Sequence, residues 1–174
     1  MRIIAGKYRG RVLASFQGDH IRPTPDRVKE SLFQILSRKI AGARVLDLFA
    51  GSGALGLECL SRGADEVLFN DSARESLTVL EKNLKIAEAG TKIFNLDFRT
   101  CLNRIEGQFD LIFCDPPYQE SYLKEILDTV KTRSLLSADG LVIYESEREE
   151  SGADGWTLSD SRKYGRTNIT MWKV

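Results

Sequence analysis

The sequence lacks long apolar runs, and none approaches the roughly 20 residues that a membrane helix needs. Its first seven residues also lack the apolar core of a signal peptide. Cysteine is scarce: Cys59, Cys101 and Cys114 each lie in an apolar stretch and have no metal-ligand spacing, and His20 is the only histidine. We therefore expect buried free thiols, no metal site and a cytoplasmic protein.

An excess of one charge is also missing, because 25 basic and 25 acidic residues cancel. The distribution is nevertheless uneven. Residues 1–39 carry nine basic and three acidic side chains, whereas residues 40–150 carry twelve basic and twenty acidic ones. A basic arm on an acidic body predicts a polyanionic partner, and the alternative is a solvated basic hairpin.

The 174 residues contain no repeat, and their length favours one domain, with residues 1–41 as an extension and residues 42–174 as the core. The extension is expected to hold a short β-hairpin and then a helix. Thr24 is a plausible N-cap and Pro25 suits the first helical position. Apolar residues then recur at helical spacing, and Gly42 closes the segment. These apolar positions are Val28, Leu32, Ile35, Leu36 and Ile40.

From residue 43 onward, short apolar runs alternate with helical patterns, which predicts an α/β fold with a parallel sheet covered on both faces. The expected strands are residues 45–49, 67–69, 93–94, 111–114 and 141–144. Residues 156–158 and 169–172 flank Tyr164-Gly165-Arg166 and predict a closing antiparallel hairpin. Loops that follow parallel strands share one edge of the sheet, where ligands bind.

A glycine-rich turn follows the first expected strand. Gly51, Gly53 and Gly56 have G-x-G-x-x-G spacing, which lets a ligand approach bare backbone at a helix N-terminus. Asp71 ends the next strand, twenty residues after Gly51, where a carboxylate can bind ribose hydroxyls. Asp47 favours S-adenosylmethionine over NAD, because a carboxylate suits the cationic amino acid part of the former and repels a pyrophosphate.

A second motif, Asp115-Pro116-Pro117-Tyr118, ends the fourth expected strand. Two prolines fix the backbone and remove two N–H donors, so the turn presents acceptors. The carboxylate of Asp115 and the carbonyl of Pro116 suit an amino group with two protons. The ring of Tyr118 offers a face on which a base can stack.

Weaker candidates follow the third and fifth expected strands. Asp97 is placed to reach an adenine amino group and Phe98 to cover its ring, although a helix N-cap explains Asp97 equally well. Glu145 and Glu147 are expected to be solvated charges.

Together these motifs resemble a class I amino-methyltransferase. The chain is most similar to the bacterial small-subunit ribosomal RNA guanine-N2-methyltransferase family, RsmD. The resemblance rests on residues 2–11, 22–33, 46–56, 115–118, 144–147 and 164–165. It implies a Rossmann-like, mostly parallel seven-stranded sheet with an antiparallel C-terminal hairpin, preceded by a small basic β-hairpin and a helix.

The resemblance also implies an activity, which is methyl transfer from S-adenosylmethionine to N2 of guanine 966 in 16S ribosomal RNA, with S-adenosylhomocysteine as product and no metal. One stretch departs from the family, which usually has Glu and then Asp or Asn two residues later where this chain has Asn70-Asp71-Ser72. We align Asp71 with the ribose carboxylate. The expected partner is ribosomal RNA within a small subunit or an assembly intermediate, and the protein is expected to be monomeric.

Three sets of residues follow from the motifs and the resemblance. The expected catalytic residues are Asp115, Pro116, Pro117 and Tyr118. The expected cofactor-binding residues are Asp47, Phe49, Ala50, Gly51, Ser52, Gly53, Gly56, Asp71, Asp97 and Phe98. The expected RNA-binding residues are Arg2, Lys7, Arg9, Arg11, Arg22 and Arg27.

Three alternatives stay open from the sequence. An adenine-N6 or cytosine-N4 methyltransferase would use the same Asp-Pro-Pro-Tyr chemistry on DNA or another RNA. An NAD-dependent oxidoreductase would use the glycine turn, although Asp47 argues against it. A non-catalytic RNA-binding assembly factor would retain the basic arm without needing the motifs.

Overall fold

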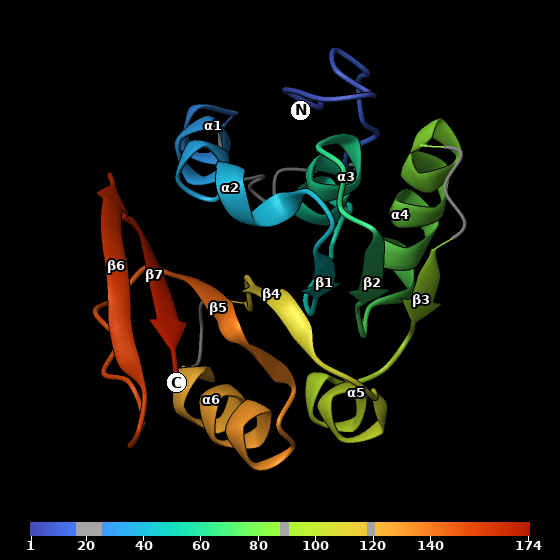
Figure 1. Cartoon of the computed structure of the whole chain (residues 1–174). Helices are drawn as coiled ribbons and strands as arrows, with labels where there is room; N and C mark the ends of the chain where they lie inside the picture. The colour runs from blue at the N-terminus through green and yellow to red at the C-terminus, as the bar shows by residue number, and fades with distance from the viewer. Residues whose placement is uncertain (17–25, 88–90, 118–120) are drawn as a thin grey trace.

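A computed structural model describes residues 1–16, 26–87, 91–117 and 121–174, and it places seven strands in one sheet (Figure 1). The strand order is β3-β2-β1-β4-β5-β7-β6. Strands β1 to β5 pair in parallel, and β7 runs antiparallel to both β5 and β6. The strands are β1 (Arg44–Asp47), β2 (Glu66–Asn70), β3 (Lys92–Phe94), β4 (Phe109–Cys114), β5 (Leu136–Ser146), β6 (Thr157–Tyr164) and β7 (Thr167–Lys173). The predicted sheet and its C-terminal hairpin are confirmed.

Helices cover both faces of the sheet. They are α1 (Asp26–Ile35), α2 (Ser37–Ile40), α3 (Ala54–Ser61), α4 (Arg74–Ala87), α5 (Phe98–Arg104) and α6 (Leu123–Thr132). One apolar cluster joins α1, α3 and α4 to the sheet, and a second joins α5 and α6 to the opposite face. Consecutive strand residues alternate between the clusters, as Val45 and Leu46 do, because side chains of a strand point to opposite faces.

The helix predicted to continue to Ile40 is interrupted at Leu36, and α2 follows as a separate short helix. The turn directs Leu36 and Ile40 into the core, where each is 1% exposed. Ile35, which shares the helical spacing, is 39% exposed, whereas the buried face of α1 consists of Val28, Lys29, Leu32 and Phe33. The proposed N-cap Thr24 and Pro25 lie outside the described residues.

The N-terminal hairpin consists of a single antiparallel bridge between Arg2 and Val12. Backbone hydrogen bonds from Ile3 N to Arg11 O (3.0 Å) and from Leu13 N to Met1 O (3.1 Å) close the loop. The loop lies against α3 (Figure 1). Ile3 and Leu13 belong to the same apolar cluster as the sheet, and the division of the chain at residue 41 stays a prediction.

The side chain of Glu58 on α3, which is 0% exposed, holds this N-terminal loop by its backbone. Its carboxylate accepts hydrogen bonds from Ile4 N at 2.8 Å and Ala5 N at 3.0 Å. It also accepts one from Arg62 Nε at 2.8 Å and lies 3.6 Å from Lys29 Nζ. Opposite charges and two amides therefore compensate a carboxylate that is fully removed from water.

Lys29 is the partner from α1, and it is 1% exposed. Burial lowers the pKa of its ammonium, while the nearby charge of Glu58 opposes that shift. Its Nζ also donates to the carbonyl of Arg2 at 2.6 Å. One buried group of charges therefore connects α1, α3 and the N-terminal loop.

Gly6 allows the loop to approach α3 this closely. Its φ is +82°, and a Cβ built there would lie 1.8 Å from the carbonyl oxygen of Ser61. Lys7 N donates to that same oxygen at 2.7 Å, and Tyr8 N donates to Ser61 Oγ at 2.9 Å. A side chain at position 6 would break both contacts.

We predict that Glu58→Gln lowers the free energy of unfolding by roughly 3–5 kcal/mol, because it leaves Lys29 buried beside a neutral group. Urea denaturation measures the loss, and hydrogen exchange should show faster exchange at the amides of Ile4 and Ala5. Glu81→Gln on the exposed side of α4 is the matched control and should change stability by less than about 0.5 kcal/mol. Equal stability of the two variants would contradict the assigned role of Glu58.

Candidate active site

The carboxyl ends of the parallel strands meet at one edge of the sheet, and the glycine turn lies there between β1 and α3. Gly51 and Gly53 have φ values of +54° and +79°. A Cβ at Gly53 would lie 2.3 Å from Leu80, and one at Gly56 would lie 2.3 Å from the ring of Phe69. Only glycine therefore lets the turn pack against β2 and α4 in this shape.

Two hydrogen bonds to the backbone of the glycine turn hold it in place. Ala50 N donates to Asn70 O at 2.8 Å, which ties the turn to the end of β2. Asn83 on α4, which is 0% exposed, donates to Ser52 O at 2.8 Å. The same amide accepts from Ala14 N at 2.8 Å and donates to Ala14 O at 3.1 Å. The N-terminal segment and the glycine turn therefore share one buried amide.

Asp47 lies under the turn and is 2% exposed. Its Oδ2 accepts a hydrogen bond from Gly56 N at 3.0 Å. Burial raises the pKa of this carboxyl to about 7; the Gly56 N–H opposes the shift and the charge of Asp71 adds to it. A cationic ligand group next to Asp47 would favour its ionised form.

Asp71 directly follows β2 at this edge of the sheet, and its side chain binds the backbone of the glycine turn. Its Oδ2 accepts from Gly51 N at 2.8 Å, and its Oδ1 accepts from Ala73 N at 2.8 Å. Asn70 is buried and donates inward to Leu48 O (3.0 Å) and Leu96 O (3.1 Å). Of these two neighbours, Asp71 is therefore the one placed to meet a ligand over the glycine turn.

Asp97 and Phe98 begin α5 after β3. Asp97 is the N-cap of α5 and accepts from Arg99 N at 3.0 Å, as the second interpretation of its position expected. Phe98 is buried between Phe49 and Tyr122, with ring centroids 5.4 and 5.0 Å away. Arg99 covers this aromatic group at 4.4 Å from the ring of Phe98.

The second motif follows β4, where Asp115 is half-buried, Pro116 is buried and Pro117 is exposed. Tyr118 lies outside the described residues. Two hollows flank the motif. The first is lined by Leu32, Leu55, Phe113, Cys114, Asp115, Ile143, Glu145 and Ile169. The second is lined by Pro116, Tyr144, Glu145, Ser146, Glu147, Arg148 and Glu150.

Glu145 lines both hollows, and sequence reasoning missed it. It was predicted to be solvated, but β5 continues to Ser146 and Glu145 is 6% exposed. For Glu147, which is exposed, the prediction is correct. The signal that could have found Glu145 is its position directly after the expected strand 141–144, because a continuous apolar strand of a parallel sheet is buried on both faces.

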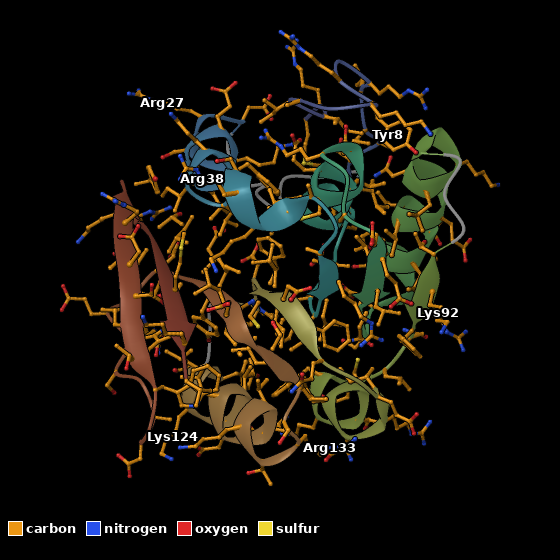
Figure 2. All side chains as sticks on the ribbon, in the orientation of Figure 1. Tyr8, Arg27, Arg38, Lys92, Lys124 and Arg133 are labelled. Carbon is orange, nitrogen blue, oxygen red and sulfur yellow. The ribbon has the colours of Figure 1, made fainter. Side chains whose placement is uncertain are left out.

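The predicted RNA-binding residues that the structure describes lie on the N-terminal loop and on α1. Lys7, Arg9 and Arg11 are exposed on the N-terminal loop, and Lys7 and Arg11 flank the ring of Tyr8 at 5.2 and 5.0 Å. Arg2 lies 3.9 Å from Asp26. Arg27 is exposed on α1 and points outward from the same end of the molecule as Tyr8 (Figure 2). Arg22 lies outside the described residues.

Across the parts of the chain that the structure describes, no helix combines the length and apolarity needed to cross a bilayer.

Comparisons with known proteins match this architecture over nearly the whole chain. The model of the family named Conserved hypothetical protein 95 matches residues 1–173. The chain is 38% identical to the ribosomal RNA small subunit methyltransferase D of Escherichia coli K12, over 99% of this chain and 89% of that protein. It is 33% identical to the Haemophilus influenzae protein of the same name, over 99% and 93%. The solved structure of Escherichia coli yhhF is 35% identical, with a TM-score of 0.88 and coverage of 99% and 96%.

The raised pKa of Asp47 predicts a pH dependence of folding. Between the ordinary value of 3.8 and about 7, the folded state holds a proton that the unfolded state releases. The stability contributed by Asp47 is therefore fully present below about pH 4 and is lost as the pH rises through about 7. Above that range both states are ionised and the contribution no longer changes with pH.

Asp47→Asn removes this titration, and its amide oxygen can still accept from Gly56 N. The stability of the variant relative to the wild type should therefore rise by roughly 2–4 kcal/mol between about pH 4 and pH 8. Urea denaturation at a series of pH values measures the difference, in which any constant cost of the amide cancels. Parallel pH curves for the two proteins would exclude the buried titration.

Proposed function

Because this chain belongs to the Conserved hypothetical protein 95 family, we propose that it is a small-subunit ribosomal RNA methyltransferase that transfers a methyl group from S-adenosylmethionine to guanine N2. The relatives named ribosomal RNA small subunit methyltransferase D support the substrate class. The proposed target is guanine 966 of 16S ribosomal RNA.

The observation that carries this proposal is the position of Asp115-Pro116-Pro117. The motif follows β4, which pairs directly with β1, and the glycine turn follows β1. A ligand held over the glycine turn and a base held at the proline turn would therefore meet across two adjacent strand ends. This proximity suits direct transfer between them.

The residues around the glycine turn fit S-adenosylmethionine. Asp71 at the rim has a carboxylate that can accept from ribose hydroxyls, and Asp47 can balance the cationic amino acid part. Asp97 and Phe98 would serve the adenine ring, and the turn itself would contribute Phe49, Ala50, Gly51, Ser52, Gly53 and Gly56. When bound, S-adenosylmethionine supplies an electrophilic methyl group.

The proline turn would prepare the nucleophile. The lone pair of guanine N2 is delocalised into the ring, and the carboxylate of Asp115 and the carbonyl of Pro116 would accept hydrogen bonds from its two N–H groups and localise the lone pair on nitrogen. As N2 gains the methyl group it gives up one proton, and Asp115 is the adjacent acceptor. Pro117 holds the turn rigid and Tyr118 would stack on the base. Most of the rate would come from positioning and fixed acceptors.

The substrate would bind through the N-terminal extension, residues 1–41. The loop that carries Lys7, Arg9 and Arg11 belongs to a segment with an excess of basic side chains, whereas residues 40–150 carry an excess of acidic ones. Its backbone is fixed by Glu58, so these cations are held on a rigid support. The base must leave its stack to enter the site. We propose that the protein acts as a cytoplasmic monomer on a small subunit or an assembly intermediate.

Mass mapping of ribosomal RNA nucleosides from cells with and without this protein tests the proposal. We expect one N2-methylguanosine in small-subunit RNA to disappear without the protein and to return when purified protein and S-adenosylmethionine are added. Loss of N6-methyladenosine or N4-methylcytidine instead would show that the target base is adenine or cytosine. An unchanged nucleoside map would exclude the proposed activity.

We predict that Asp115→Ala abolishes methyl transfer, because the amino group loses its main proton acceptor, while S-adenosylmethionine affinity stays within a few-fold. Single-turnover assays measure transfer, and calorimetry measures binding, with NAD expected to give no binding heat. Asp139→Ala, an exposed aspartate at the start of β5, is the matched control and should keep wild-type activity. Near wild-type turnover by folded Asp115→Ala would remove Asp115 from the mechanism.

We predict that replacing Arg9 and Arg11 by Ala weakens RNA binding for all sequences. Each lost phosphate contact should flatten the slope of log affinity against log salt by roughly 0.7–0.9. Unfolding free energy should fall by less than about 1 kcal/mol, since both arginines are exposed and exposed charges contribute little to folding.

Lys92→Ala with Lys124→Ala removes the same charge far from the N-terminal loop (Figure 2) and should leave the salt slope unchanged. If the arginine pair lost stability and kept its RNA affinity, the loop would be a folding element instead.

A further inference from the structure

The pairing of β4 with β5 places Glu145 next to Asp115. The parallel register joins Phe113 to Ile143 and Cys114 to Tyr144, so positions 115 and 145 follow as neighbours. Phe113 and Ile143 face the cluster under α1 and α3, whereas Cys114 and Tyr144 face α5 and α6. Side chains alternate along a strand, so Asp115 and Glu145 both return to the side of α1 and α3.

The first hollow lies on that side and contains both carboxylates. The rest of its lining is almost entirely apolar, including Leu32 from α1, Leu55 from α3 and Ile169 from β7. Glu145 is 6% exposed and held within β5, which pairs with β7 through Glu145 and Ile169. A rigid strand therefore presents a second carboxylate beside the proposed proton acceptor, in surroundings where a mismatched polar ligand group is costly.

We propose that Glu145 is the residue that selects guanine, by accepting a hydrogen bond from its N1–H while Asp115 and the carbonyl of Pro116 accept from N2. This inference rests on the proposed function and assigns its base specificity. Guanine presents an N1–H donor directly beside its amino group. Adenine and cytosine present a ring nitrogen lone pair at the corresponding place, and a carboxylate repels it. Glu145 therefore excludes the wrong bases as well as binding the right one.

The test compares two bases that share the N2 amino group. Small subunits are reconstituted with ribosomal RNA that carries either guanine or 2-aminopurine at the mapped methylation site. The N1 of 2-aminopurine carries no proton, so Glu145 would face a lone pair. Glu145→Gln keeps the shape of the side chain and introduces an amide that can donate to that lone pair.

We expect kcat/KM of Glu145→Gln for guanine to fall roughly 10- to 100-fold, the effect of losing a hydrogen bond to a charged group. The ratio of guanine to 2-aminopurine transfer should fall at least about tenfold relative to the wild type. Taking this ratio in both proteins cancels the intrinsic reactivity of the two bases. S-adenosylmethionine affinity should stay within a few-fold.

Glu149→Gln is the matched control, because Glu149 is exposed four residues further on and lines neither hollow. It should keep the wild-type ratio. A folded Glu145→Gln that slows both substrates equally, or neither, would overturn the assignment. Failure of the wild type to form N2-methylguanosine on any subunit would instead overturn the proposed function.

Glu145→Asp provides a second variant if the amide prevents folding. It keeps the charge but withdraws the carboxylate, so guanine transfer should slow without any gain on 2-aminopurine. Unchanged guanine transfer by Glu145→Asp would also overturn the role of Glu145.

Discussion

The buried carboxylate of Glu58 is the interaction on which the N-terminal third of the molecule depends. It binds two backbone amides of the N-terminal loop and lies beside Lys29 of α1, and it projects from α3, the helix that begins at the glycine turn. Removing either charge would leave the other buried and uncompensated, so the group acts as a unit. The loop, α1 and the glycine turn are therefore positioned from one helix.

Asn83 extends this dependence from the loop to the turn itself. Its amide satisfies both backbone groups of Ala14 and the carbonyl of Ser52, so displacing residues 1–14 would leave buried polar groups without partners. The backbone of the basic arm is thus part of the folded core, while its exposed cations contribute little to folding. The structural role of the arm therefore belongs to its backbone, and the proposed RNA contact would belong to its exposed side chains.

Much of the fold could be predicted because strand alternation and the two motifs are local patterns. The family resemblance is confirmed by a family match over residues 1–173 and by relatives above 30% identity, and the class I methyltransferase sheet is present. Lys29 and Glu58 could not be predicted to be buried, because they compensate each other from different helices and Glu58 also binds amides of the N-terminal loop. Ile35 shares the helical spacing but lies off the buried face of α1, which Val28, Lys29, Leu32 and Phe33 form.

The alternation that builds the core also arranges the site. One residue of each of four strands faces α1, α3 and α4: Val45, Val67, Phe113 and Ile143. An even number of residues further along, the same strands or the residues that follow them carry Asp47, Asp71, Asp115 and Glu145. Asp47 therefore ends β1 and Glu145 lies near the end of β5 on this side of the sheet, while Asp71 and Asp115 directly follow β2 and β4. A shift of one residue in any strand would turn its carboxylate toward α5 and α6 and expose its apolar residues to the wrong face. The register that protects the core thus also fixes which side of the sheet can bind a ligand, and the acids at its edge cannot change sides independently of the fold.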